Sequence, residues 1–132
     1  MTLTGRCHCG AISYSVEGEP QHSSLCHCED CRRCAGAPVV GWAAFETEQV
    51  TIKGSPASYA SSEHATRQFC GTCGAGLFYV NEQVLPGLID IQIATLDDPE
   101  ALPPQIQVQA AERLGWMNGV DDLPAFERYP AG

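Results

Sequence analysis

Short runs of alternating apolar and polar residues, separated by glycine, proline and polar turns, dominate this chain. Residues 11–16 alternate clearly, with Ile12, Tyr14 and Val16 on one face and small polar residues on the other. Residues 88–95 alternate over a longer stretch. A period of two residues indicates half-buried β-strands rather than helices.

Further short segments have the same composition and end at turn residues. They are residues 39–45, 49–53, 58–60, 66–69, 77–80 and 106–110. Helix is expected only as single turns, after Cys28 and over residues 122–126. The pattern predicts a mainly β fold of short antiparallel sheets with few short helical turns. The chain shows no internal repeat or linker, so we expect a single domain over residues 1–132.

Composition and charge exclude several classes of function. No run approaches the roughly eighteen apolar residues that a membrane span needs, so we expect no membrane insertion. The formal net charge of −9 repels phosphate backbones, so we expect no nucleic-acid partner. The sequence carries no signal for a particular oligomeric state.

The eight cysteines fall into three tight groups. The groups are Cys7 with Cys9, then Cys26, Cys28, Cys31 and Cys34, then Cys70 with Cys73. A tetrahedral zinc ion needs thiolates at about 2.3 Å that converge from short loops, and C-x-C and C-x2-C turns present paired sulfurs in that way. Clustered thiols of this kind indicate metal ligands.

A disulfide framework is the competing interpretation of an even cysteine count. The first residues reach the cysteine motif at once and do not resemble a signal peptide, so we expect a cytoplasmic protein. The reducing cytosol disfavours disulfides, and close C-x-C pairs cannot bridge without strain. We therefore favour metal binding.

Spacing alone allows several partitions of the eight thiols between two metal sites. One partition joins Cys7 and Cys9 with Cys70 and Cys73, and leaves the middle group for the second site. That second site is either a closed cage that includes Cys34 or a three-cysteine site with one open coordination position. Otherwise Cys34 is a spare buried thiol or a redox-active one.

Positive charge gathers around the thiols. The arginines within three residues of a cysteine are Arg6, Arg32, Arg33 and Arg67. They compensate the negative charge of thiolate ligands, recognise an anionic ligand, or do both. The histidines between cysteines, His8 and His27, are expected to point away from the metal, and the sequence selects none of Asp90, Asp97 and Asp98 as an acid or base.

Three linked motifs resemble those of the glutathione-dependent formaldehyde-activating enzyme family. They are Gly5-Arg-Cys7-His-Cys9-Gly10, Cys26-His-Cys28-Glu-Asp-Cys31-Arg-Arg33, and Phe69-Cys70-Gly-Thr-Cys73-Gly74. Weaker similarity extends to residues 95–99 and to the tail from Trp116 to Pro130. The resemblance implies the Mss4-like fold, in which zinc staples short antiparallel sheets.

The resemblance also implies two zinc ions per chain. A structural zinc would be held by Cys7, Cys9, Cys70 and Cys73. A catalytic zinc would be held by Cys26, Cys28 and Cys31, with its fourth position open to water or a substrate thiol. Cys34 lies outside the family motif.

The function implied is that of a carbon–sulfur lyase, an S-(hydroxymethyl)glutathione synthase-like enzyme. It would form or cleave a thiol–carbonyl adduct from formaldehyde and a small-molecule thiol, glutathione in the family. Arg32 and Arg33, beside the catalytic cysteines, are the expected substrate-binding residues. The alternative is a non-catalytic, zinc-stabilised binding module of the same fold.

Overall fold

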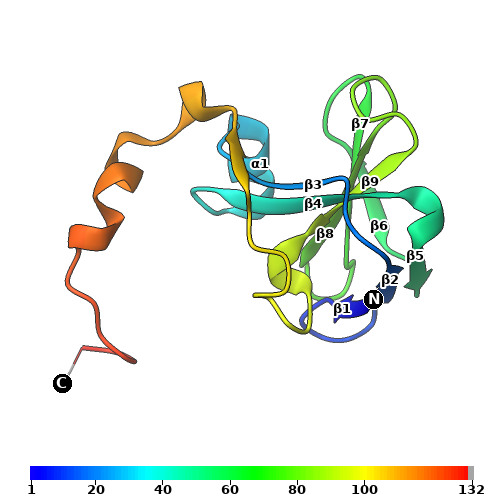
Figure 1. Ribbon diagram of the computed structural model, residues 1–132, viewed down its shortest axis with the longest axis horizontal. Helices are drawn as coiled ribbons and strands as arrows, with labels where there is room; N and C mark the ends of the chain where they lie inside the picture. The colour runs from blue at the N-terminus through cyan, green and yellow to red at the C-terminus, as the bar shows by residue number, and fades with distance from the viewer. Residues whose placement is uncertain (131–132) are drawn as a thin grey trace.

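Two β-sheets form the body of the protein in a computed structural model that describes residues 1–130 (Figure 1). The three-stranded sheet has the order β1 (Thr2–Arg6), β2 (Ser13–Glu17), β5 (Val50–Lys53). The seven-stranded sheet has the order β10 (Ile106–Val108), β3 (His22–Cys26), β4 (Val40–Glu46), β9 (Leu88–Gln92), β8 (Gly76–Asn81), β7 (Ala65–Phe69), β6 (Ala57–Ala60). Neighbouring strands are antiparallel except β10, which pairs parallel to β3.

Within residues 1–130, helical structure is limited to one short α-helix and several 3-10 segments. Helix α1 spans Glu29–Ala35, and the 3-10 segments are η1 (Thr47–Gln49), η2 (Ile93–Thr95), η3 (Ala110–Glu112) and η4 (Gly115–Asp122). The helix begins at Cys28, whose side chain caps it, and ends at Gly36, whose φ of 64° is left-handed and favours glycine. Among the described residues, no helix is long and apolar enough to cross a membrane.

The predicted mainly β, Mss4-like fold is confirmed, with some differences in its elements. The predicted strand 88–95 ends at Gln92, because the chain turns into η2 there. The predicted turn at residues 122–126 is wrong, since the 3-10 segment η4 precedes it and ends at Asp122. Strands β1 and β3 were not predicted, because Leu3 is the one apolar residue of β1 and β3 buries serines.

The main core lies between the two sheets. Tyr14 from β2 meets Phe78 from β8 edge to face, with ring centroids 5.4 Å apart. Val16, Phe45 and Ile91 are also fully buried there. The apolar face predicted from residues 11–16 is therefore the face that packs on the larger sheet, and its burial stabilises the contact between the sheets.

The last described residues form an arm that leaves the body. Segment η4 and the residues after it extend away from both sheets, coloured orange to red in Figure 1. Trp116, Leu123, Phe126 and Tyr129 are exposed along this arm. The body therefore folds without using the arm as part of its core.

We predict that Gly5→Ala destabilises the protein. A Cβ at Gly5 would overlap the Tyr14 ring and lie 2.7 Å from the backbone oxygen of Thr95, so the contact between β1 and the core must open. Overpacking of this kind costs about 1–3 kcal/mol. Urea unfolding monitored by circular dichroism measures the loss. Gly115→Ala is the control, since its Cβ would meet no atom within 4 Å beyond its neighbours along the chain. Equal unfolding midpoints for the two variants would contradict the prediction.

Candidate metal centre and its cavity

Four cysteines from two distant loops converge at one end of the three-stranded sheet. Cys7 and Cys9 follow β1, and Cys70 and Cys73 follow β7; their sulfurs all lie within 4.8 Å of one another. The Cys9 Sγ lies 3.7 Å from both the Cys7 Sγ and the Cys70 Sγ. Tetrahedral thiolates at 2.3 Å from a zinc ion stand about 3.8 Å apart, so this donor set fits such an ion.

The two loops of this cluster share one construction. The backbone N–H of Cys7 donates to the Ile12 carbonyl, and that of Cys70 donates to the Ala75 carbonyl, each at 3.0 Å. Backbone N–H groups also donate to the first sulfur of each loop, from Ile12 to Cys7 at 3.3 Å and from Cys73 to Cys70 at 3.4 Å. Such donors stabilise a thiolate, so both loops are built to hold negative sulfur.

A second cluster of three cysteines lies where β3 passes into α1. Cys26 ends the strand, Cys28 caps the helix and Cys31 lies in its first turn, and their sulfurs lie within 4.8 Å of one another. The Cys26 and Cys31 sulfurs are 3.5 Å apart, and the Cys31 backbone N–H donates to the Cys28 sulfur at 3.2 Å. All eight cysteines are free, which agrees with the preference for metal binding over disulfides.

Arg67 is the cation that contacts the three-cysteine cluster. Its two terminal nitrogens donate to the Cys31 sulfur at 3.7 and 3.8 Å, and its Nε donates to the Ser61 hydroxyl at 3.1 Å. The guanidinium also lies 4.9 Å from the centre of the Tyr79 ring. The hydrogen bond shared with Cys26, together with the Arg67 charge, lowers the pKa of Cys31 to about 5.

The three-cysteine cluster opens into a cavity of about 760 Å³. Its floor is the face of the seven-stranded sheet opposite the main core. Directly paired residues form a row across that face: His22 on β3, Ala44 on β4, Asp90 on β9, Tyr79 on β8 and Arg67 on β7. A volume of this size is typical of small-molecule sites.

Asp90 is the buried acidic residue of the cavity floor. It is 7% exposed, and its Oδ1 atom has no hydrogen-bond partner among the described residues. Burial, and then the negative charge of Cys31, raises the pKa of Asp90 to about 6. A buried carboxylate without a partner costs stability, so its presence in a cavity indicates a function.

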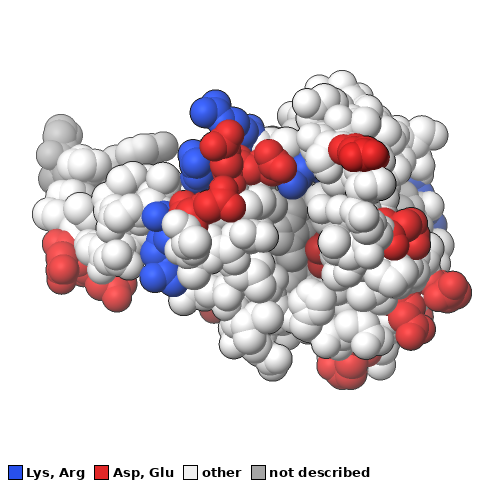
Figure 2. All heavy atoms as spheres, turned by 90° about the horizontal axis from the view of Figure 1, so that it is seen from above, with Lys and Arg blue, Asp and Glu red and all other residues white. Residues whose placement is uncertain are grey.

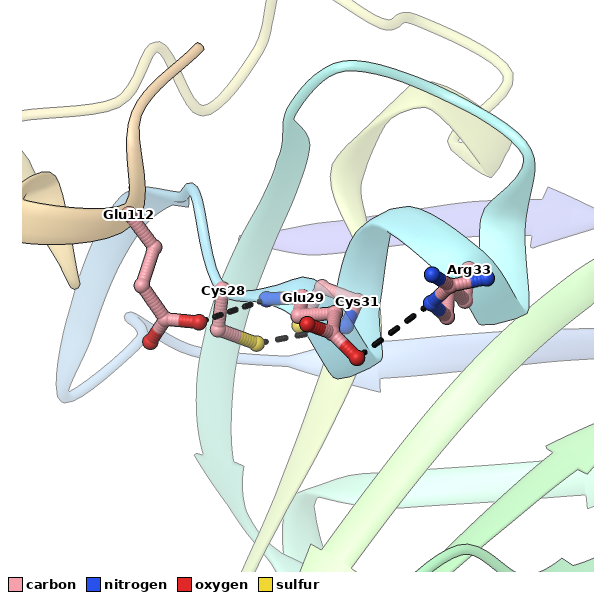
Figure 3. Close-up of polar contacts among 5 residues, drawn as sticks. All are labelled: Cys28, Glu29, Cys31, Arg33 and Glu112. Atoms are coloured by element: carbon pink, nitrogen blue, oxygen red, sulfur yellow. Dashed lines mark hydrogen bonds and ion pairs between the residues drawn. The ribbon is translucent and has the colours of Figure 1, made fainter.

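The rim of the cavity is built by α1 and η3. The backbone N–H of Glu29 donates to the Glu112 carboxylate at 3.0 Å, which ties η3 to the start of the helix beside Cys28 (Figure 3). Arg33 pairs with the Glu29 carboxylate at 3.3 Å and lies further along the helix (Figure 3). The rim therefore presents carboxylates beside the cysteine sulfurs.

Arg32 and Arg33 are not among the residues that line this cavity. They line a separate hollow with Pro38 and Trp116. Their predicted contact with a substrate stays a prediction.

Cys34 is exposed and lies outside the three-cysteine group. An α-helix rises about 1.5 Å per residue, so Cys34 lies about 4.5 Å further along the helix axis than Cys31. This rise separates the two side chains. His8 and His27 belong to neither cluster; His27 is buried with its Nε2 2.8 Å from the Gln107 Oε1.

Sequence reasoning missed the role of Arg67 beside Cys31 and did not select Asp90. Arg67 appeared near Cys70 in the sequence, whereas strand β7 turns its side chain to the other cluster. The sequence placed Asp90 on the strand face opposite Ile89 and Ile91, where a polar residue is ordinarily exposed. The structure shows that Asp90 is buried. A polar residue on a strand covered on both faces indicates a site.

The fold and the two cysteine clusters define a small β protein with a compact four-cysteine site and a three-cysteine site in a cavity. A profile of the family described as glutathione-dependent formaldehyde-activating enzyme matches residues 2–112. The chain belongs to this family, as its motifs predicted.

Two relatives with curated names are similar in sequence. A putative glutathione-dependent formaldehyde-activating enzyme of Halomonas elongata is 28% identical over 131 positions, which cover 89% of this chain and 80% of the relative. An uncharacterized lyase of Schizosaccharomyces pombe is 35% identical over 75 positions, 57% of this chain. This match spans only 55% of the yeast protein.

A crystal structure of a Rhodobacter sphaeroides protein has the same fold. It superposes with a TM-score of 0.62 at 24% sequence identity, over 79% of this chain and 97% of the other. The arrangement of sheets described above is therefore found in a solved structure.

We predict that metal content follows the two clusters. Cys28→Ser should lower the metal bound per chain by one ion, because it removes one of only three thiolates at its site. Cys34→Ser, on the same helix, should leave the metal content unchanged. Elemental analysis of protein purified without chelators measures both, and metal loss in Cys34→Ser would show that Cys34 is a ligand.

We predict that Asp90→Asn stabilises the protein above pH 6. The folded-state pKa of Asp90, about 6, exceeds its unfolded value, so this residue adds stability only in acid and loses it as the pH rises through 6. Removing the charge should raise the free energy of unfolding at pH 8 by on the order of 2 kcal/mol, with a smaller gain at pH 5. Urea unfolding at both pH values measures this, with the exposed Glu48→Gln as control; a gain that does not change with pH would contradict it.

Proposed function

We propose that this protein is a zinc-dependent carbon–sulfur lyase that forms or cleaves a thiol–carbonyl adduct such as S-hydroxymethylglutathione. The proposal draws on the family description and on the Halomonas and yeast relatives, whose names describe a formaldehyde-activating enzyme and a lyase. Its catalytic cysteines are Cys26, Cys28 and Cys31. Zinc at the cluster of Cys7, Cys9, Cys70 and Cys73 is structural.

The observation that carries this proposal is a cluster of three cysteines, rather than four, at the wall of a cavity. A structural zinc site is closed by four protein ligands, whereas a catalytic site keeps one position for water or substrate. The four-cysteine cluster and the three-cysteine cluster match these two types. In the part of the chain that the structure describes, the three-cysteine cluster lines a cavity that admits a small molecule.

A zinc ion bound by the three sulfurs would supply a Lewis-acidic position that favours the ionised form of a substrate thiol. The chain supports that form in two ways. Arg67 offsets the negative charge of Cys31 through its two N–H contacts. Trp42 and Tyr79, with ring centroids 5.9 Å apart, form an apolar part of the cavity floor that limits water.

The reaction balances without an oxidant or reductant. In the forward direction a carbon–sulfur bond forms between the thiol sulfur and the aldehyde carbon, and the carbonyl electron pair moves to oxygen. The proton released by the thiol ends on that oxygen. The reverse reaction breaks the same bond and returns the proton to sulfur.

A second candidate function is protein binding by the arm. Exposed Trp116, Leu123 and Phe126 form apolar surface outside the body, which is a common feature of interaction segments. This role would use the arm and not the three-cysteine cavity, so it is compatible with the catalytic proposal.

We predict that zinc-loaded protein accelerates the exchange between hydrated formaldehyde and S-hydroxymethylglutathione. Proton exchange spectroscopy by NMR at neutral pH measures the rate with and without protein. The rate acceleration by Cys28→Ser should be smaller than that by the unaltered protein by about tenfold or more, because its site no longer holds the metal.

Cys34→Ser is the matched control, with the same chemical change on the same helix and outside the cluster. It should retain the acceleration. No acceleration by fully metal-loaded protein with either glutathione or a small thiol such as 2-mercaptoethanol, or equal rates for the two variants, would contradict the proposed function.

A further inference from the structure

Acidic side chains dominate the charge of the three-cysteine cavity. Its carboxylates are Glu29, Asp30 and Glu112 at the rim and Asp90 at the floor, and its one permanently charged cation is Arg67. Figure 2 shows acidic side chains crowded beside basic ones on this face of the molecule. Carboxylates that line a concave site focus a negative potential, which concentrates cations there.

The nearby arginines do not neutralise this set. Arg67 is bound to the Cys31 sulfur and Ser61, where it compensates thiolate charge. Arg33 pairs with Glu29 alone. Arg113 donates to Gln107 at 2.8 Å. Asp30, Asp90 and Glu112 therefore form no ion pair among the described residues.

The side chain of Asp90 is independent evidence that the cavity binds a ligand with a positively charged group. Its side chain is more than nine-tenths buried, lines the cavity, and leaves Oδ1 without a partner among the described residues. Its paired neighbours across the sheet are Ala44 and Tyr79, neither of which carries a positive charge. A buried carboxylate in this setting is satisfied best by a cationic hydrogen-bond donor that enters with the ligand.

We propose that the thiol substrate of this site is an aminothiol, whose protonated amine is bound by Asp90 while its sulfur reaches the cluster of Cys26, Cys28 and Cys31. This inference rests on the proposed function and specifies its substrate class. Asp30 and Glu112 at the rim attract the cation, and Asp90 on the floor binds it.

Glutathione fits these charges less well than a simple aminothiol. It carries more carboxylates than amines, and each carboxylate would have to pass the acidic rim and find a cation in the cavity. Arg67 is the one arginine there, and it is already bound to Cys31. Like charges placed opposite one another lower affinity and provide specificity against the wrong ligand.

Three small thiols that each carry a polar group two methylenes from sulfur test the charge preference. Cysteamine carries an amine, 2-mercaptoethanol a hydroxyl and 3-mercaptopropionate a carboxylate. Calorimetric titration of the zinc-loaded protein with each thiol, and with glutathione, gives four dissociation constants without any measurement of activity. Cysteamine should bind most tightly.

The same titrations on Asp90→Asn separate the role of Asp90 from the different acidities of the free thiols. Those acidities cancel when each thiol is compared between the two proteins. Asp90→Asn should weaken cysteamine by about tenfold or more, as expected for loss of a charged hydrogen bond. The affinity for 2-mercaptoethanol should stay the same, and that for 3-mercaptopropionate should rise.

Two further variants support the comparison. Glu112→Gln keeps the oxygen that accepts from the Glu29 N–H but removes a rim charge, so it should weaken cysteamine by a smaller factor. Glu48→Gln removes an exposed carboxylate outside the cavity and should change nothing. Zinc content and circular dichroism are checked for every variant, and Glu112→Gln keeps the test valid if Asp90→Asn does not fold.

The outcomes separate this inference from the proposed function. Tighter binding of glutathione or 3-mercaptopropionate than of cysteamine would overturn the aminothiol assignment and leave the thiol-binding function intact. An unchanged cysteamine affinity in Asp90→Asn would do the same. No binding of any of the four thiols to zinc-loaded protein would overturn the proposed function itself.

Discussion

The convergence of Cys7, Cys9, Cys70 and Cys73 is the constraint on which the rest of the structure depends. Two of these cysteines, Cys7 and Cys70, are buried in the main core, so the cluster is part of the packing between the sheets. It joins the end of β1 to the loop between β7 and β8. Four thiolates repel one another, so a bound cation at this point would hold together segments that are distant in sequence.

One face of the seven-stranded sheet packs in the core, and the other face lines the cavity. One face carries Phe45, Phe78 and Ile91 into the core, and the other carries Asp90, Tyr79 and Arg67 into the cavity. The period of two along each strand allows this division, because alternate side chains point to opposite faces. A sheet covered on both sides can therefore stabilise the fold with one face and bind a ligand with the other.

Local signals predicted much of this fold from sequence. The alternation in residues 11–16 predicted β2, and the cysteine spacing predicted a helical turn after Cys28. Spacing left several partitions of the thiols open, and the family resemblance implied the two clusters that the structure brings together. Strand β3 escaped prediction because Ser23 and Ser24 are buried there, where tertiary pairing with β4 overrides a weak local preference. The approach of Arg67 to Cys31 depends on how β7 is placed in the sheet, which no local pattern encodes.

The helix geometry after β3 explains why only three of the four middle cysteines form a cluster. Cys28 and Cys31 have the same spacing as Cys31 and Cys34, yet only the first pair meets. Cys28 is the N-cap, with an extended backbone at φ −65° and ψ 153°, so its sulfur folds back to accept the Cys31 N–H. Cys34 is one regular turn further along the helix axis and is carried away from the cluster. A C-x2-C spacing thus brings sulfurs together in a turn or at a helix start but separates them inside a helix, and here that difference limits the second cluster to three sulfurs.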